Sequence, residues 1–125
     1  MQRCLDALVS GDEATIRDSF ADDAVWSMHG DLPIAGPWKG RKEIVDDFLG
    51  AVGGALFEPG TVNFEFPTLI AEGDTVMLEW RVNAHAASGV EYHNEYCGVF
   101  VVRDDRIATV REYMDSKYAA ETRFS

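Results

Sequence analysis

An arginine and an asparagine stand one residue apart in a segment that otherwise has the pattern of a β-strand. The segment TVMLEWRVNAHA (75–86) alternates apolar and polar residues, so Arg81 and Asn83 share one face. An arginine can hold a carboxylate, and an amide can orient a water or a carbonyl but cannot accept a proton at ordinary pH. This polar face is either exposed to water, with Arg81 in a cross-strand ion pair, or it lines a cavity.

The last predicted strand (106–118) supplies a carboxylate for such a cavity. Its alternation puts Arg111, Tyr113 and Asp115 on one face, and Val110, Glu112 and Met114 on the other. The neighbouring strand carries Tyr92, Asn94, Tyr96 and Gly98 on one face. Charges mixed with aromatic residues are typical of a pocket that has an apolar body and a few polar anchors. Asp115 is then either a pocket acid/base or a surface carboxylate at a strand end.

Several other side chains are candidates for contacts with a substrate. His29 lies in a predicted loop and could form a hydrogen bond to a substrate, although a single loop histidine is often just exposed. Four further candidates could line the pocket or belong to the core: Trp26, Met28, Tyr96 and Tyr113. No two histidines have metal-ligand spacing together with a carboxylate, so no metal site is predicted.

The order of the predicted elements indicates an α+β fold. Asp12 is a candidate N-cap for a helix that follows a first helix within residues 1–10. A short strand (24–28), a breaker-rich loop (30–40) and a helix (41–50) come next. Four strands then follow, separated by turn residues, and they predict an antiparallel meander: 62–70, 76–86, 91–102 and 106–118. We expect one domain over residues 1–125.

Composition argues against several classes of partner. The chain has 125 residues with 22 acidic and 11 basic side chains, a net charge of −11. Nucleic acids and anionic membranes attract basic proteins, so neither is an expected partner. No apolar run reaches membrane-spanning length, and the first residues lack the pattern of a signal peptide. We therefore expect a cytoplasmic protein in which Cys4 and Cys97 are free thiols.

Three segments carry a family resemblance: GDEATIRDSFADDAVW, GPWKGRKEI and EYCGVFVVRDDRIATVREYMD. With the order of elements, they resemble the SnoaL-like branch of the nuclear transport factor 2-like superfamily, which includes limonene-1,2-epoxide hydrolase, polyketide cyclases and steroid isomerases. The resemblance implies a cone-shaped barrel, in which a curved antiparallel sheet wraps around three helices and encloses one deep pocket. It also implies dimerisation through the convex face of the sheet.

The resemblance is incomplete at the catalytic positions. Arg81 and Asp115 match two members of the Arg-x-Asp and Asp triad of the epoxide hydrolases, but Asn83 stands where the second carboxylate is expected. The water-positioning tyrosine and asparagine of those enzymes fall near Trp26 and Met28. The general base and the tyrosine donor of the isomerases fall near Met28 and Cys4, so neither set is present.

The function predicted from these residues is that of a cofactor-independent enzyme acting on a small, hydrophobic, oxygenated molecule. Asp115 would be the general acid/base, Arg81 would tune it, and Asn83 would hydrogen-bond a substrate oxygen or a water. Isomerisation, cyclisation and hydration or hydrolysis all stay open. The alternatives are a non-catalytic ligand-binding or interaction domain, and an epoxide hydrolase with an altered triad.

Placing the polar face of residues 75–86 in the pocket has a consequence for the apolar face. Leu78, Trp80 and Val82 would then lie on the convex side, where they would be exposed in a monomer. Exposed apolar patches of this kind commonly form interfaces between subunits. We therefore expect a homodimer through these three residues.

Overall fold

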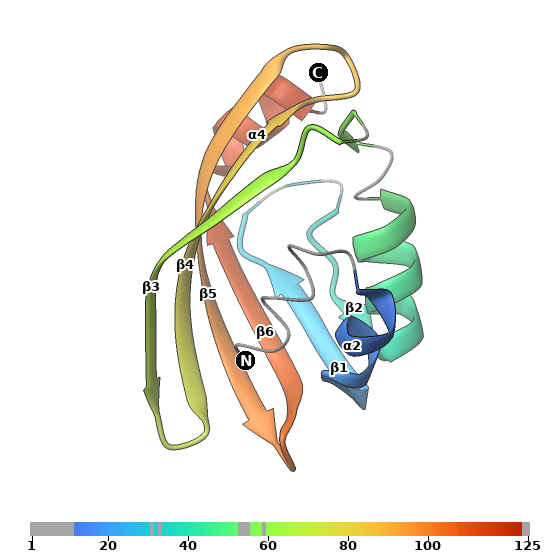
Figure 1. Cartoon of the computed structure of the whole chain (residues 1–125), viewed down its shortest axis with the longest axis vertical. Helices are drawn as coiled ribbons and strands as arrows, with labels where there is room; N and C mark the ends of the chain where they lie inside the picture. Colours follow the sequence, from blue (N-terminus) through green and yellow to red (C-terminus); the bar gives the residue numbers. More distant parts are fainter. Residues whose placement is uncertain (1–11, 31, 33, 53–55, 59, 124–125) are drawn as a thin grey trace.

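A computed structural model describes residues 12–30, 32, 34–52, 56–58 and 60–123 of the chain. A curved six-stranded sheet with the strand order β2-β1-β6-β5-β4-β3 forms the body of the molecule (Figure 1). The strands are β1 (Phe20–Met28), β2 (Trp38–Lys39), β3 (Asn63–Glu72), β4 (Thr75–His85), β5 (Glu91–Arg103) and β6 (Arg106–Met114). The helices are α2 (Glu13–Asp18), η1 (Glu43–Val52) and α4 (Ser116–Arg123). The expected α+β fold with a curved sheet is confirmed.

The predicted meander is present, with each of the strands β3 to β6 antiparallel to the next. The turn between β5 and β6 holds Asp104 and Asp105 at φ values of 53° and 63°, the left-handed conformation that tight hairpins require. The sheet is nevertheless mixed, because β1 pairs in parallel with β6. The two-residue strand β2, within the predicted loop 30–40, adds the outermost pair beside β1.

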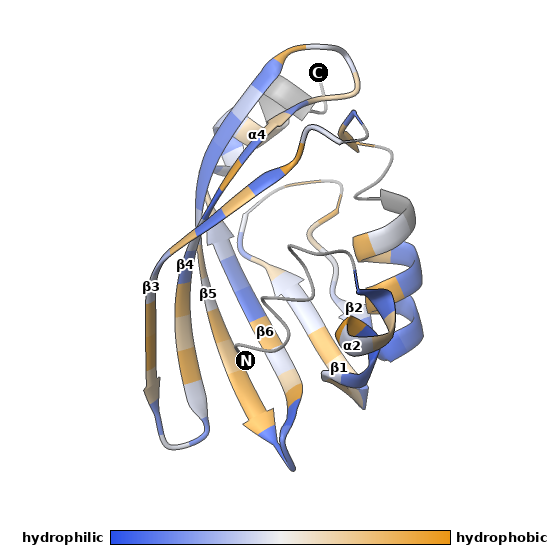
Figure 2. Ribbon diagram, viewed as in Figure 1, coloured by the Kyte–Doolittle hydropathy of each residue, from blue (hydrophilic) through white to orange (hydrophobic). Residues whose placement is uncertain are grey.

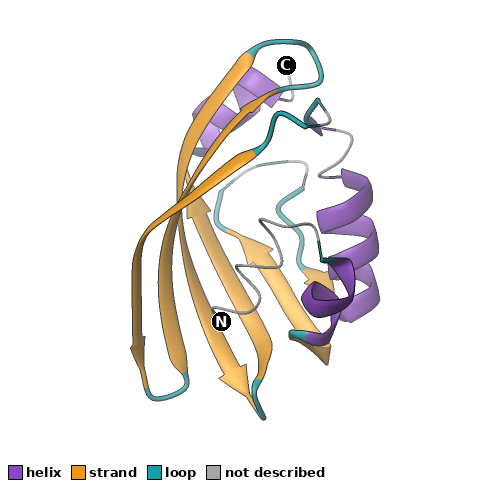
Figure 3. Ribbon diagram, viewed as in Figure 1, coloured by secondary structure: helices purple, strands orange, loops and turns teal. Residues whose placement is uncertain are grey.

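Helices α2 and η1 lie on the same side of the sheet, and α4 follows β6 (Figure 3). Ile44, Val45 and Phe48 of η1 are buried, as the helical spacing predicts. The expected N-cap of α2 is confirmed, because Asp12 Oδ1 accepts a hydrogen bond from the Thr15 N–H at 3.3 Å. The helix predicted within residues 1–10 lies outside the described residues. No helix in the described part of the chain is long and apolar enough to cross a membrane.

The sequence pattern extends the last strand to Tyr118, but β6 ends at Met114 and α4 begins at Ser116. Asp115 is the reason for this change. Its Oδ1 accepts a hydrogen bond from the Tyr118 N–H at 3.0 Å, which satisfies a donor in the first turn of α4. A side-chain cap of this kind favours the helix over a continued strand.

The orientation predicted for β4 is wrong. Its apolar residues are buried in the core, including Leu78 at 2% and Trp80 at 8% exposure, whereas its polar residues alternate with them and are largely exposed. Figure 2 shows this alternation of hydrophobic and hydrophilic residues along the strand. We call the face that carries Trp80 the inner face of the sheet, and the face that carries Arg81 the outer face. Burial of apolar area decides the orientation, because exposing a residue as large as Trp80 to water is costly.

The surface predicted for dimerisation is therefore not available. Leu78, Trp80 and Val82 pack within the core of their own chain, with at most 8% of each side chain exposed. The outer face instead carries exposed apolar side chains of its own, namely Ile70 at 60%, Met77 at 48% and Tyr113 at 39%.

An ion pair between Arg17 and Asp46 joins α2 to η1. The hydrogen bond from Arg17 lowers the pKa of Asp46 from its ordinary value of 3.8. A carboxyl with a lower pKa in the folded state stabilises the fold above its unfolded pKa, and this contribution disappears as the pH falls through the lower, folded value. We expect Asp46→Asn to lower the thermal unfolding midpoint near neutral pH, and the difference from wild type to shrink at about pH 3.

Asp47→Asn is the matched control, since Asp47 is exposed and forms no ion pair with any described residue. It removes the same charge from the same helix. Equal effects of the two variants at both pH values would show that net charge, and not the Arg17 contact, is responsible.

Candidate functional site

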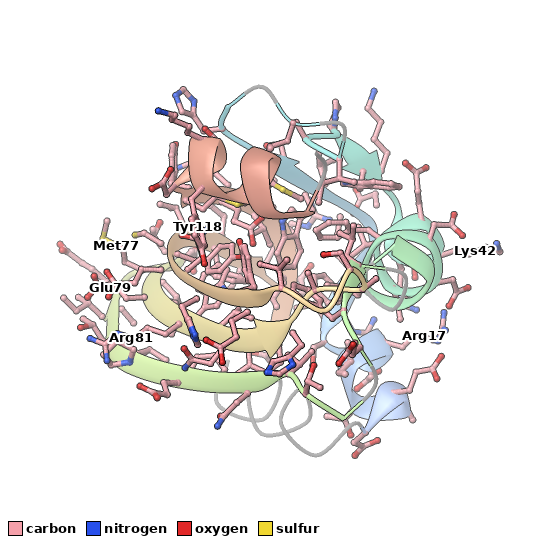
Figure 4. The ribbon with its side chains drawn as sticks, turned by 90° about the horizontal axis from the view of Figure 1, so that it is seen from above. Arg17, Lys42, Met77, Glu79, Arg81 and Tyr118 are labelled. Atoms are coloured by element: carbon pink, nitrogen blue, oxygen red, sulfur yellow. The ribbon has the colours of Figure 1, made fainter. Side chains whose placement is uncertain are left out.

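Arg81, the arginine predicted to lie in the pocket, lies on the outer face. Its guanidinium pairs with Glu65 at 3.3 Å and with Glu95 at 3.2 Å, and 47% of its side chain is exposed. The hydrogen bonds to Glu65 and then to Glu95 raise the pKa of Arg81. Figure 4 shows Arg81 and its neighbours Met77 and Glu79 pointing away from the body of the molecule. The arginine forms a cross-strand ion pair, so the geometry from which its catalytic role was predicted is absent.

Asn83 lies on the same outer face. Its Oδ1 is 2.7 Å from Nδ1 of His93, its cross-strand neighbour on β5. His29 and Tyr113 also meet outside the core, with ring centroids 5.4 Å apart. His29 is exposed, and Tyr113 pairs with Cys97 on the outer side of the β5–β6 ladder. These residues thus lie away from the inner face.

Asp115 does not contact Arg81. Its side chain is exposed and caps α4, and its backbone carbonyl accepts a hydrogen bond from Asn94 Nδ2 at 3.2 Å. The predicted catalytic group of Asp115, Arg81 and Asn83 is not brought together. What Asp115 does in this structure is to end β6 and begin the following helix.

Three of the predicted substrate-contacting residues do share the inner face. Trp26 and Met28 of β1 and Tyr96 of β5 are buried at 7%, 8% and 7% exposure. Tyr96 stacks on Trp80 with a centroid distance of 5.3 Å and an interplanar angle of 1°. The inner face is therefore strongly aromatic, which suits a flat, hydrophobic molecule.

Glu112 is the carboxylate that the sequence prediction missed. It is 6% exposed and lies on the inner face of β6, and no other aspartate or glutamate among the described residues is buried. Its cross-strand neighbours are Gly98 on β5 and Met28 on β1. The signal was present in the sequence, because Glu112 stands between Val110 and Met114 on the apolar side of the last strand.

The glycine opposite Glu112 leaves room for an aromatic ring. A Cβ at Gly98 would lie 2.7 Å from Cζ3 of Trp80 and 2.7 Å from Cε1 of Phe100, closer than packed carbon atoms approach. The indole of Trp80 thus leans across the position next to Glu112. Gly98 is needed here for this close approach.

A hydrogen-bonded group of polar side chains lies along β5 on the same face. The hydroxyls of Tyr92 and Tyr96 are 2.6 Å apart, and Asn94 Nδ2 donates to the Tyr92 hydroxyl at 2.7 Å. Tyr92 also stacks on Tyr118 of α4 at 5.3 Å. Asn94 links this group to the start of α4 through the Asp115 carbonyl. The inner face therefore combines aromatic walls with a carboxylate, hydroxyls and an amide.

Chemically, this arrangement suits proton transfer on a small organic molecule. Glu112 can donate or accept a proton, and the surrounding rings limit the access of water, which strengthens electrostatic interactions with a substrate. Within the part of the chain that the structure describes, no three His, Cys, Asp or Glu side chains gather in a group that could hold a metal ion.

A curved sheet with helices on one side is the architecture of the nuclear transport factor 2-like cone fold. The sequence matches the SnoaL-like domain over residues 1–110, and the chain belongs to this family. No curated protein matches the sequence.

Solved structures share the whole fold. Bal32a, from a soil-derived mobile gene cassette, is 29% identical with a TM-score of 0.85, and the match covers 98% of this chain and 92% of that one. A Bacillus subtilis protein named as an isomerase is 21% identical with a TM-score of 0.73, covering 93% and 84%. A protein from Jannaschia sp. CCS1 named as a SnoaL-like polyketide cyclase is 14% identical with a TM-score of 0.76, covering 96% and 88%. At these identities, the last two show the fold alone.

Proposed function

We propose that this protein is a small-molecule enzyme of the isomerase or cyclase type, in which Glu112 is the general acid/base. The observation that carries the proposal is the buried position of Glu112 on the aromatic inner face. Structural neighbours named as an isomerase and a polyketide cyclase support the reaction class. Glu112 thereby takes the role that the sequence pattern suggested for Asp115. The substrate class is a flat, hydrophobic ketone or a related carbonyl compound.

The proposed first step is enolisation. The Glu112 carboxylate removes a proton from the carbon next to a carbonyl group, and the C–H electron pair becomes the C=C bond of an enolate whose charge lies on oxygen. Return of the proton to a conjugated carbon completes an isomerisation. In a cyclisation, the enolate carbon instead attacks a second carbonyl of the same molecule. A C–C bond forms as the π bond of that carbonyl breaks, and the resulting alkoxide takes the proton back from Glu112. Both outcomes need one carboxylate.

Epoxide hydrolysis is less well supported by the same geometry. The triad mechanism uses two carboxylates with an arginine between them, whereas Arg81 lies on the outer face between Glu65 and Glu95. Among the described residues, Glu112 is the only aspartate or glutamate with a buried side chain.

The second candidate function is ligand binding without catalysis. The observation in its favour is that rings fill much of the inner face around Glu112: Trp80 and Phe100 both lie against Gly98, and Trp26 lies 6.1 Å from Phe100 between ring centroids. A binding domain would use the same aromatic surface but would not transfer a proton.

Exchange of hydrogen for deuterium in a simple ketone separates the two candidates. We expect the protein to accelerate deuterium incorporation at the carbon next to the carbonyl of α-tetralone in D₂O, followed by NMR against a buffer blank. Binding of α-tetralone with exchange at the buffer rate would favour the ligand-binding domain. Acceleration by wild-type protein, lost after addition of a tight-binding aromatic competitor, would support the enzyme.

We propose that the protein forms a homodimer through the outer face, in place of the Leu78, Trp80 and Val82 patch. Ile70 and Met77 are cross-strand neighbours on this face, at 60% and 48% exposure. A lysine at position 70 would place an uncompensated charge in this apolar interface. We expect Ile70→Lys to shift the sedimentation coefficient of the protein from dimer to monomer. A wild-type protein that sediments as a monomer would rule out this interface.

A further inference from the structure

The indole N–H of Trp26 is a buried hydrogen-bond donor that meets no acceptor in the described part of the chain. Trp26 is 7% exposed, and its Nε1 is buried and has no hydrogen-bond partner among the described residues. Buried donors are nearly always paired in folded proteins, so an exception requires an explanation. The indole of Trp38 shows the usual arrangement, since its Nε1 donates to the Ile34 carbonyl at 2.9 Å.

The Trp26 ring cannot readily turn to find an acceptor elsewhere. Ring centroids of three neighbours surround it, at 5.3 Å for Phe48, 6.1 Å for Phe20 and 6.1 Å for Phe100. These come from η1, β1 and β5, so contacts from three separate elements hold the indole. Rotation of the indole would disrupt its close packing against these three rings. The direction of the N–H is thus fixed, and an acceptor must come to it.

The position of Trp26 relative to Glu112 indicates where such an acceptor would belong. In the β1–β6 ladder Trp26 pairs with Val110, and Met28 pairs with Glu112, so Trp26 and Glu112 are diagonal neighbours on the inner face. A ligand that spans this diagonal would meet a proton-transfer group at one end and a fixed hydrogen-bond donor at the other.

We propose that Trp26 Nε1–H is the donor that binds a carbonyl oxygen of the ligand. This inference rests on the proposed function and adds to it, because it assigns the group that recognises the substrate oxygen. A ligand with an acceptor oxygen forms a hydrogen bond to this N–H and so binds more tightly. A hydrocarbon forms no hydrogen bond there. The site therefore selects flat carbonyl compounds over hydrocarbons of the same shape.

The test uses ¹⁵N-labelled wild-type protein, α-tetralone and tetralin, the matched hydrocarbon that lacks the oxygen. The chain has three tryptophans, so three indole N–H signals are expected, and the signal lost in Trp26→Phe identifies Trp26. We expect α-tetralone to shift the Trp26 indole proton downfield as a hydrogen bond forms, and tetralin to leave it without a downfield shift. The Trp38 indole is the internal control, because it is already bonded to Ile34.

Affinity provides the second readout. Trp26→Phe keeps an aromatic ring but removes the donor together with the five-membered ring of the indole. We expect the preference for α-tetralone over tetralin to fall by about tenfold. The ratio cancels changes in packing that affect both ligands. An unchanged ratio in a folded variant would overturn the proposal.

Two further outcomes would also overturn the assignment. One is the absence of a downfield shift at the highest soluble concentration of α-tetralone. The other is a persistent cross-peak between the indole proton and a bound water that α-tetralone does not displace, which would make water the partner. These readouts are independent of turnover. A downfield shift without deuterium exchange would support the role of Trp26 and contradict the proposal that the protein is an enzyme. Deuterium exchange without a downfield shift would support the enzyme and contradict the role of Trp26.

Discussion

Trp80→Ala is expected to lower the free energy of unfolding by about 3–5 kcal/mol, the usual cost of removing a large aromatic side chain from a core. Trp80 is 8% exposed, stacks on Tyr96 at 5.3 Å and packs against Gly98. Its replacement leaves a cavity in the middle of the inner face. Urea unfolding followed by circular dichroism measures the effect.

Glu79→Ala, on the outer face of the same strand, is the matched control. Glu79 is exposed, and we expect its loss to change the free energy of unfolding by no more than about 0.5 kcal/mol. The opposite ranking would restore the orientation in which Trp80 lies at a subunit interface. A Trp80→Ala protein that is monomeric but as stable as the wild type would also contradict the structure.

Glu112→Gln is expected to lower the rate of deuterium exchange into α-tetralone by about 10²–10⁴-fold, the range typical of losing a general acid/base. Glutamine has nearly the same shape and keeps a hydrogen-bonding head group, but it cannot take up a proton. Binding of α-tetralone should therefore persist while exchange falls toward the buffer rate. The effect belongs to the chemical step, because the aromatic walls are unchanged.

Asp115→Asn separates this assignment from the one that the sequence favoured. Asparagine caps helices about as well as aspartate, so the start of α4 should be retained. We expect the exchange rate of this variant to stay within about twofold of wild type, because a folded cap leaves the inner face undisturbed. A large loss in Asp115→Asn, together with normal exchange in Glu112→Gln, would return the catalytic role to Asp115.

Alternation in the sequence was sufficient to divide each strand into two faces. The division of β4 into Trp80 and Arg81 sides is correct, as is the division of β6 into Glu112 and Tyr113 sides. The error was the choice of the inner side, which followed the match of Arg81 and Asn83 to an Arg-x-Asp pattern. Because the period of a strand is two, a shift of one residue in such a match turns every side chain to the opposite face. The large apolar side chains of Trp80 and Leu78 favour burial, and this criterion alone predicts that their face is the inner one.

Strand alternation and cross-strand register explain why the structure does not bring the predicted site residues to one face. Tyr96 is buried on the inner face, whereas Tyr113 pairs with Cys97, the next residue along β5, and therefore lies on the outer face. Register depends on turns and on irregularities such as the one between Val101 and Val102, which the residue pattern does not specify. The helix α4 was missed for a local reason, since Asp115 can either continue a strand or cap a helix.

The most direct test of the site is a structure determined from crystals of the protein that have been soaked with α-tetralone. We expect the ketone on the inner face, with the carbon next to its carbonyl against the Glu112 carboxylate and its oxygen within hydrogen-bond distance of Trp26 Nε1. Density for the ketone on the outer face, between Arg81 and Asp115, would contradict the assignment of the inner face as the functional site.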